Sequence, residues 1–457
     1  MLLHKKVIEI DSNDIFSGFF PEREPQVKGL TRLLSADTEP TTICINSAWG
    51  NGKTTFLRIL NAHLESEGYP TIFLNVWELD YSIDSMSALI GEVCKSIDSS
   101  WAEDSTTLSK IKETIKKSAK PFIKNSISTV LKIATYGALD LDKVSEQEIG
   151  KALDGIVKDH IDSYEENKKS MDSLKNALQE FADLNYSKTN KPLIFIIDEL
   201  DRCKPHFSIE FLERVKHLFS LDKIKFVIAT DKEQLCHSIN SVYGLNFDAS
   251  GYLKRFFDFE FFLSLPQNCE YFKELISKYK IISVLNKLHK TNNEVSFIIS
   301  VFTFLVHTYC LTLREQEQCI SALNVALKSF DHFFDLDICY MSLLIVIKIK
   351  KHELYEKYVK ESVSSLEIVN DLAGKVTIAN ENREIMLFIS LKAFQSDNDD
   401  ISSQSFWSFL NSANYSTSIL LNEKEAQDYV NRHTQSRSTN RKMDYIKQVE
   451  FLKNFQF

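Results

Sequence analysis

The sequence predicts an α/β fold: a five-stranded, mainly parallel sheet covered by helices, with a helical insertion and an α-helical C-terminal region. Three observations support this. Five short apolar or β-branched segments alternate with segments of helical spacing, as in a parallel sheet covered on both faces. PLIFIID (192–198) is continuously apolar, which is typical of a strand buried on both sides. The 457 residues include 12 glycines and 8 prolines but 32 phenylalanines, which favours few turns and many helices.

The expected elements follow in chain order. Besides 192–198, strands are predicted from β-branched and apolar runs at residues 41–46, 71–77, 224–230 and 259–265. Helices are predicted from amphipathic spacing at residues 26–34, 54–66, 86–97, 208–220 and 232–242.

Composition divides the chain into five parts. Residues 99–190 are rich in Lys, Ser, Asp and Glu and show no strand pattern, so they are interpreted as a helical insertion. From residue 267 onward the pattern is nearly all helical. The expected parts are two halves of the core at 1–98 and 191–266, the insertion at 99–190, a helical lid at 267–330 and a helical C-terminal domain at 331–457.

The charge balance limits the classes of partner. The formal net charge is −9, from 54 basic and 63 acidic residues. This argues against a general nucleic-acid coat protein, although DNA stays open as a partner through a local basic groove. The eight cysteines form no C-x-x-C pair, which is typical of reduced, mostly buried thiols in a cytosolic chain.

The best candidate for a membrane segment is VSFIISVFTFLVHTYCL (295–311). It is shorter than the roughly 20 residues that cross a bilayer, and it carries several hydroxyl side chains and a histidine. A buried core helix is therefore expected. The N-terminus has no apolar run long enough for a signal peptide. The sequence predicts a soluble, cytoplasmic protein with no membrane-spanning segment.

The stretch INSAWGNGKTTFL (45–57) carries a phosphate-binding loop between a strand and a helix, the context that such a loop requires. Gly50 and Gly52 let backbone N–H groups approach an anion without a Cβ in the way. Lys53 supplies a positive charge to the β- and γ-phosphates, and Thr54 supplies a hydroxyl to Mg²⁺. The expected nucleotide-binding residues in this loop are Ser47, Trp49, Gly50, Asn51, Gly52, Lys53, Thr54 and Thr55.

The loop departs from the pattern G-x-x-x-x-G-K-[ST], because Ser47 stands in the place of the first glycine. That glycine starts the turn, whereas the anion contacts come from the later glycine, the lysine and the backbone amides. Serine is small and fits there if its φ is negative. We therefore expect a working site.

The segment IFIIDELDRC (194–203) supplies the acidic partner of the loop. Asp198 ends a buried strand, where it can hold Mg²⁺ through the water shell of the ion. Glu199 can act as a general base on the water that attacks the γ-phosphate. Asp201 and Arg202 are expected to be structural or coupling residues. ATP and Mg²⁺ are the expected cofactors, since the chain has no N-K-x-D guanine motif.

Four segments together resemble the KAP family of P-loop NTPases, a class related to AAA+ and STAND ATPases. AWGNGKTTFL resembles its W-G-x-G-K-[ST] loop, and IIDELDRCKP resembles its D-[DE]-L-D-R segment. FLNVWELDYSIDSMSALI and YLKRFFDFEFFLSLP resemble its second-strand segment and the approach to its last strand. Many members carry membrane helices between the loop and the acidic strand. Here the insertion is charged and amphipathic, and we expect it to pack on the core. The alternative for its Lys-rich piece (110–133) is an acidic membrane surface or nucleic acid.

The resemblance implies further site residues. Arg255, just before the last strand, stands where such enzymes carry an arginine finger for the nucleotide of a neighbouring subunit. Thr230 and Asp231, at the end of the fourth strand, fit a position that orients the attacking water. Arg314 fits the start of a lid helix that faces the nucleotide. Glu199, Lys53, Arg255 and Thr230 form the expected catalytic set.

The resemblance also implies a function. The chain is similar to soluble bacterial phage-exclusion and anti-phage defence ATPases, so we expect ATP hydrolysis to drive a conformational or assembly switch. A homo-oligomer with separate effector or sensor proteins is expected. Two alternatives stay open: a DNA-handling ATPase motor or loader, and a nucleotide-bound scaffold that does not hydrolyse, for which Glu199 is an inconvenient residue.

Overall fold

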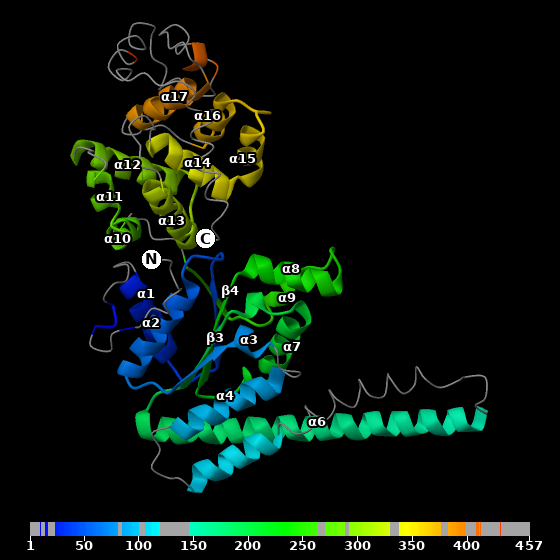
Figure 1. Cartoon of the computed structure of the whole chain (residues 1–457). Coiled ribbons are helices and arrows are strands. Elements are labelled where there is room, and N and C mark those ends of the chain that lie inside the picture. Colours follow the sequence, from blue (N-terminus) through cyan, green and yellow to red (C-terminus); the bar gives the residue numbers. More distant parts are fainter. Residues whose placement is uncertain are drawn as a thin grey trace. The chain divides into compact units, whose positions relative to one another are not determined.

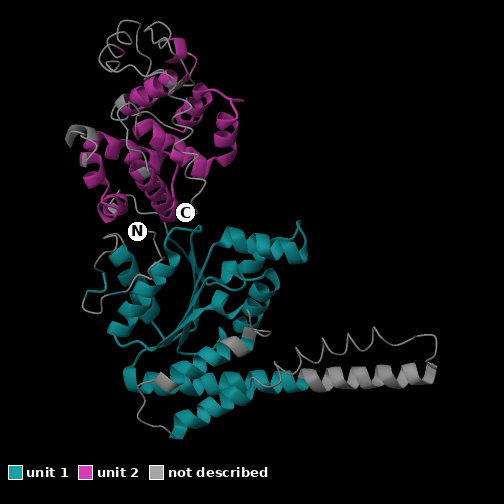
Figure 2. Ribbon diagram, viewed as in Figure 1, with its two compact units in different colours: residues 1–264 teal, residues 265–457 magenta. Residues whose placement is uncertain are grey.

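The computed structural model describes most of the chain and divides it into two compact units, residues 1–264 and 265–457 (Figure 2). The described ranges are 23–80, 85–99, 106–118, 146–263, 270–287, 292–329, 338–375 and 383–397, with a few single positions besides. The finer division into five parts stays a prediction. The candidate site lies in the first unit.

The first unit contains a five-stranded sheet in the order β2-β3-β4-β1-β5, in which every neighbouring pair is parallel. The strands are β1 (Thr41–Asn46), β2 (Thr71–Asn75), β3 (Leu193–Asp198), β4 (Ile224–Thr230) and β5 (Phe259–Phe262). This confirms the predicted fold class. The register sets Asn46 beside Thr230 and Asn75 beside Asp198, so the carboxyl ends of the central strands meet at one edge.

Two strands end earlier than predicted. β2 stops at Asn75 because residues Val76–Leu79 form the short helix α3. Asn75, the residue before this helix, donates from Nδ2 to Glu78 Oε1 at 2.8 Å. β5 stops at Phe262. Of the predicted residues past these ends, Val76 and Leu263 are buried, whereas Trp77 is 51% exposed.

Helices cover both faces of the sheet (Figure 1). One face packs on α1 (Arg23–Ser35) and α2 (Lys53–Ser66). The other packs on α4 (Ser85–Ser99), α6 (Glu146–Thr189), α7 (Pro205–Val215), α8 (Lys232–Tyr243) and α9 (Ala249–Leu253). β3 alternates between the two cores: Ile194 and Ile196 join the first, and Phe195 and Ile197 join the second. This double burial explains its continuous apolar sequence.

The insertion contributes to the second core. Leu108 and Ile111 of the helix at 106–118 are buried with Leu178 and Phe181 of α6. These positions pack on the core, as the sequence suggested. Residues 119–133 of the Lys-rich piece lie outside the described residues.

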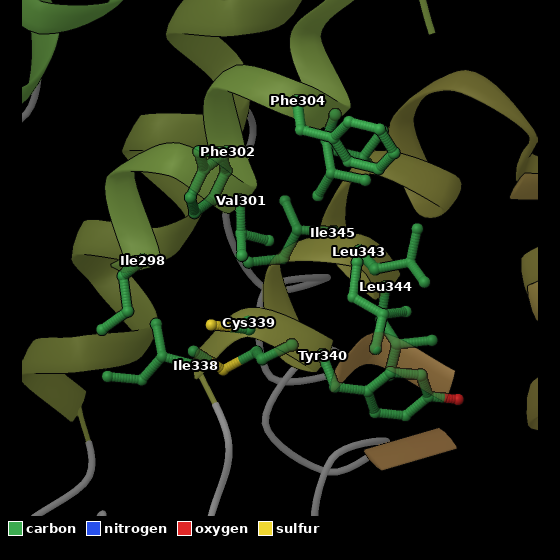
Figure 3. Close-up of a cluster of buried hydrophobic side chains, with 14 of the residues drawn as sticks. Ile298, Val301, Phe302, Phe304, Ile338, Cys339, Tyr340, Leu343, Leu344 and Ile345 are labelled. Atoms are coloured by element: carbon green, nitrogen blue, oxygen red, sulfur yellow. The ribbon is translucent and has the colours of Figure 1, made fainter. Parts of the chain in front are cut away.

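The second unit is helical. Its helices are α10 (Glu270–Lys278), α11 (Ile281–Lys287), α12 (Asn292–Thr308), α13 (Leu313–Ser329), α14 (Ile338–Lys350), α15 (His352–Val359), α16 (Ser365–Ala373) and α17 (Arg383–Asp397). Residues 338–347 of α14 are buried all around, among side chains of α12 and its other neighbours (Figure 3). Such a helix has no solvent face, because it forms the centre of its unit.

The segment 295–311 falls mostly in α12, where Val301, Phe302 and Leu305 are buried. Among the described residues, no helix combines the length and apolarity needed to cross a membrane. The seven cysteines in the described part of the chain are all free thiols, and five of them are buried; Cys269 lies outside that part.

Candidate active site

The phosphate-binding loop connects β1 to α2 through two glycines in the left-handed region. Gly50 has φ 88° and Gly52 has φ 83°. Gly52 is the N-cap of α2 and offers no side chain to the first-turn N–H groups. A helix N-terminus with free N–H groups and its positive dipole end attracts anions. The loop therefore has the backbone of an anion site.

Ser47 is tied to three parts of this region. Its N–H donates to the carbonyl of Thr230 at 3.3 Å, and its hydroxyl donates to the carbonyl of Leu263 at 2.8 Å. Asn51 Nδ2 donates to the same hydroxyl at 3.0 Å. Ser47 is not among the residues with positive φ, which satisfies the condition set for a serine at this position.

Lys53 is buried at the start of α2. Its Nζ donates to the carbonyl of Ser47 at 2.6 Å and lies 3.5 Å from Asp201 Oδ2. The ammonium thus lies under the loop, where phosphate oxygens would reach it.

Asp198 faces the loop from the end of β3. Burial raises the pKa of Asp198 to about 6, an effect partly offset by the Thr54 hydroxyl and by the N–H of Glu199 at 2.8 Å. Asp198 Oδ2 is buried and has no hydrogen-bond partner among the described residues. A buried, unpartnered carboxylate oxygen beside a threonine hydroxyl fits a hard cation such as Mg²⁺. Thr54 and Asp198 would hold it.

Glu199 follows in an unusual backbone conformation. Its φ of 62° is left-handed, and its side chain forms an ion pair with Arg202. The Arg202 guanidinium in turn lies over the half-exposed ring of Trp77, 5.6 Å from its centroid. Glu199 is therefore next to the proposed metal ligand, but one of its oxygens is held by a cation. Thr230, at the end of β4, is fully buried, and its Oγ1 has no partner within the described ranges.

Two aspartates make contacts with the loop that no sequence pattern indicates. Asp201 Oδ2 accepts hydrogen bonds from the indole Nε1 of Trp49 and the N–H of Asp231, both at 2.7 Å. Asp231 is the N-cap of α8, where its side chain accepts a hydrogen bond from the N–H of Gln234. Its side chain also accepts a hydrogen bond from the N–H of Trp49 at 3.0 Å. Position directly after a buried strand was the available signal for Asp231.

Sequence reasoning missed Arg23. It is buried at the start of α1, and its Nη2 donates to the carbonyl of Asn51 at 3.4 Å. No sequence pattern marks it, since 28 positions separate donor from acceptor.

The structure brings some predicted residues together and leaves others apart. Thr55 lies in the first turn of α2, and Asn51 is buried beside Ser47. Arg255 is exposed after α9 and makes no side-chain hydrogen bond or ion pair with the described residues. Arg314 is exposed at the start of α13, in the second unit, so its approach to the nucleotide stays a prediction.

Residues 23–330 match the model of the KAP family P-loop domain. A solved structure of the ORC2 protein from Aeropyrum pernix, in ADPNP–ADP complexes, is similar at 12% identity, over 96% of this chain and 88% of that chain. Its TM-score is 0.28. The curated proteins include no match.

Proposed function

The chain belongs to the KAP family of P-loop NTPases, and from this premise we propose that it is an ATPase, which binds ATP with Mg²⁺ and hydrolyses it to drive a conformational or assembly switch. The observation that carries the proposal is the meeting of two chain segments at one sheet edge. Lys53 and Thr54 are the first residues of α2. Asp198 is the last residue of β3, and Glu199 directly follows it. Phosphate, cation and base sites thus adjoin.

Each residue has a role that its surroundings support. The loop N–H groups and Lys53 bind the phosphates. Thr54 and Asp198 hold Mg²⁺, which when bound neutralises charge on the phosphate oxygens. Glu199 takes the proton of the attacking water, and the unpartnered Thr230 hydroxyl is available to orient that water. Arg202 pairs with one oxygen of Glu199, so the other oxygen is left for the water.

The proposed assembly rests on Arg255. An exposed arginine with no partner among the described residues is available to a neighbouring copy, where it would stabilise charge on the γ-phosphate. The homo-oligomer, a separate effector or sensor protein, and a place in bacterial anti-phage defence are supported by the family resemblance. The role in defence is tested by plaque counts on cells that carry the wild-type chain or Glu199→Gln. If both protect the cells equally, ATP hydrolysis is not required for defence.

The test of the ATPase is steady-state hydrolysis by the full chain. Glu199→Gln should lose roughly 10²-fold or more of the rate while still binding ATP, because it removes the base and keeps the loop. Lys53→Ala should lose binding. The matched control is Lys223→Ala, since Lys223 pairs with Asp183 and does not contact the loop.

Two outcomes favour the alternatives. If the wild-type chain binds ATP but does not hydrolyse it, either alone or as an oligomer, the function is that of a nucleotide-bound scaffold. Hydrolysis that DNA stimulates several-fold moves the function to a DNA-handling motor or loader. Size-exclusion chromatography with and without ATP reports whether assembly follows nucleotide state.

A further inference from the structure

Asp201 lies beside the phosphate-binding loop but belongs to neither the proposed metal nor the proposed base site. It sits in η2 (Leu200–Arg202), directly after β3, with its side chain 1% exposed. One oxygen, Oδ2, accepts hydrogen bonds from the Trp49 indole and the Asp231 N–H, each at 2.7 Å. The same oxygen lies 3.5 Å from Lys53 Nζ. A single carboxylate therefore contacts the loop, the end of β4 and the start of α2.

Lys53 depends on this carboxylate for its charge balance. Its side chain is only 9% exposed, and among the described residues Asp201 is the one acidic side chain within salt-bridge distance. The other contact of its ammonium is the neutral carbonyl of Ser47 at 2.6 Å. A buried ammonium without a counter-ion is strongly unfavourable. In the ligand-free chain, Asp201 supplies that counter-ion.

A bound nucleotide would offer Lys53 a second anion. The lysine ammonium is a compact charge that phosphate-binding loops direct to the β- and γ-phosphates. Asp201 then acts against binding in two ways. It stabilises the ligand-free state by pairing with Lys53, and in the bound state its own negative charge repels the phosphates. Its charge already acts within the site, because it contributes to the raised pKa of Asp198.

We propose that Asp201 is a built-in counter-ion of the phosphate-binding lysine, which takes the place of phosphate in the ligand-free chain and lowers the affinity of the site for nucleotides. This rests on the proposed function, since it assumes that Lys53 binds phosphate. Asp201 is a positioning residue: it holds the empty loop together through Trp49 and Lys53, and it makes nucleotide binding weaker than the loop alone would allow.

The test is calorimetric titration of the full chain with ATP and, separately, with tripolyphosphate, which presents phosphates without base or sugar. Asp201→Asn keeps the size and an acceptor for Trp49 and Asp231 but removes the charge. The Kd of both ligands should fall by about fivefold or more, at the low end of the coupling expected between two interacting sites. A residue that only orients the loop would instead give weaker binding on substitution.

Two control variants separate charge from loop geometry. Asp231→Asn removes a carboxylate that also accepts a hydrogen bond from Trp49 but makes no ion pair with Lys53. Trp49→Phe removes the indole hydrogen bond and leaves the Lys53–Asp201 pair. Neither should lower the Kd. If either tightens binding as Asp201→Asn does, loop relaxation explains the effect and the proposal fails.

Other outcomes also decide the matter. Unchanged or weaker binding by Asp201→Asn overturns the proposal while leaving the proposed ATPase intact. Wild type that binds neither ligand overturns the proposed function. In that case a double-mutant cycle with Lys53→Met and Asp201→Asn, followed by urea unfolding, measures the coupling free energy between the two side chains without nucleotide. Zero coupling overturns the pairing of Asp201 with Lys53.

The same cycle covers a variant that does not fold. If Asp201→Asn is unfolded, the cause should be the orphaned lysine charge, and adding Lys53→Met should restore folding because both buried charges are then gone. A double variant that also fails to fold shows that the lysine charge is not the cause, and the proposal fails.

Discussion

The hydroxyl of Ser47 donates a hydrogen bond to the backbone carbonyl of Leu263 at 2.8 Å, and so joins the start of the phosphate-binding loop to the residue after β5. Asn51 Nδ2 donates to the same hydroxyl at 3.0 Å. A glycine at this position could make neither contact. The serine that departs from the usual loop pattern therefore adds a tie between the loop and the edge strand.

Replacing Ser47 with glycine should destabilise the first unit by about 1–2 kcal/mol, because two hydrogen bonds are lost and the unfolded chain gains freedom. Urea unfolding measures the change. Ser47→Ala separates the two causes, since it removes the hydroxyl without the extra backbone freedom. ATP affinity should persist in both, and a glycine variant as stable as wild type would contradict this account.

The strands and the loop could be predicted because their signals are local. A buried strand such as 193–198 shows its burial in every residue, and G-K-T after a strand has one common structural context. The contacts that hold the site together are not local. Trp49 and Asp201 are 152 positions apart, and Lys53 reaches Asp201 from another element. No spacing rule links such residues, so a carboxylate central to the site was predicted to be only a structural or coupling residue.

The left-handed backbone of Glu199 predicts a conflict between stability and activity. A non-glycine residue at φ 62° is strained, and glycine relieves that strain. The free energy of unfolding, measured in urea, should therefore be about 1 kcal/mol higher for Glu199→Gly than for Glu199→Gln, while both variants lose most of the ATP hydrolysis. Glutamine is the matched reference, because both variants lose the ion pair with Arg202. Equal stability of the two would show that the conformation carries no strain.

Arg202 should affect turnover more than ATP binding. It pairs with Glu199 and packs over Trp77, so it fixes the orientation of the proposed base. Arg202→Ala should lower kcat about tenfold with KM nearly unchanged, a part of the 10²–10⁴-fold that a positioned base contributes. Arg214→Ala is the control, since Arg214 makes a similar ion pair with Glu210 on the surface of α7. A rise in KM with kcat constant would place Arg202 in binding instead.

The ion pair of Lys225 should make the stability of the first unit depend on pH in the acid range. It is 1% exposed in β4, and its Nζ pairs with Asp37 Oδ1 at 2.8 Å. This pairing holds the pKa of Asp37 below its usual value of 3.8. An acid whose pKa is lower in the folded chain adds stability above its unfolded pKa and loses it as pH falls through the folded pKa. Asp37→Asn should therefore unfold at a clearly lower temperature than wild type at neutral pH, and the gap should close as pH falls below 3.8.

Thermal unfolding of both proteins between about pH 7 and about pH 3 measures this gap. Glu24→Gln is the control within the same unit, because its partner Lys28 is 47% exposed where Lys225 is buried, and ion pairs between two exposed side chains contribute little. Its gap should be small at every pH. A gap for Asp37→Asn that stays constant into the acid range would mean that the amide is disfavoured by shape or hydrogen bonding. The buried Lys225 ammonium would then draw its stability from Thr41 Oγ1, 3.4 Å away, rather than from the charge of Asp37.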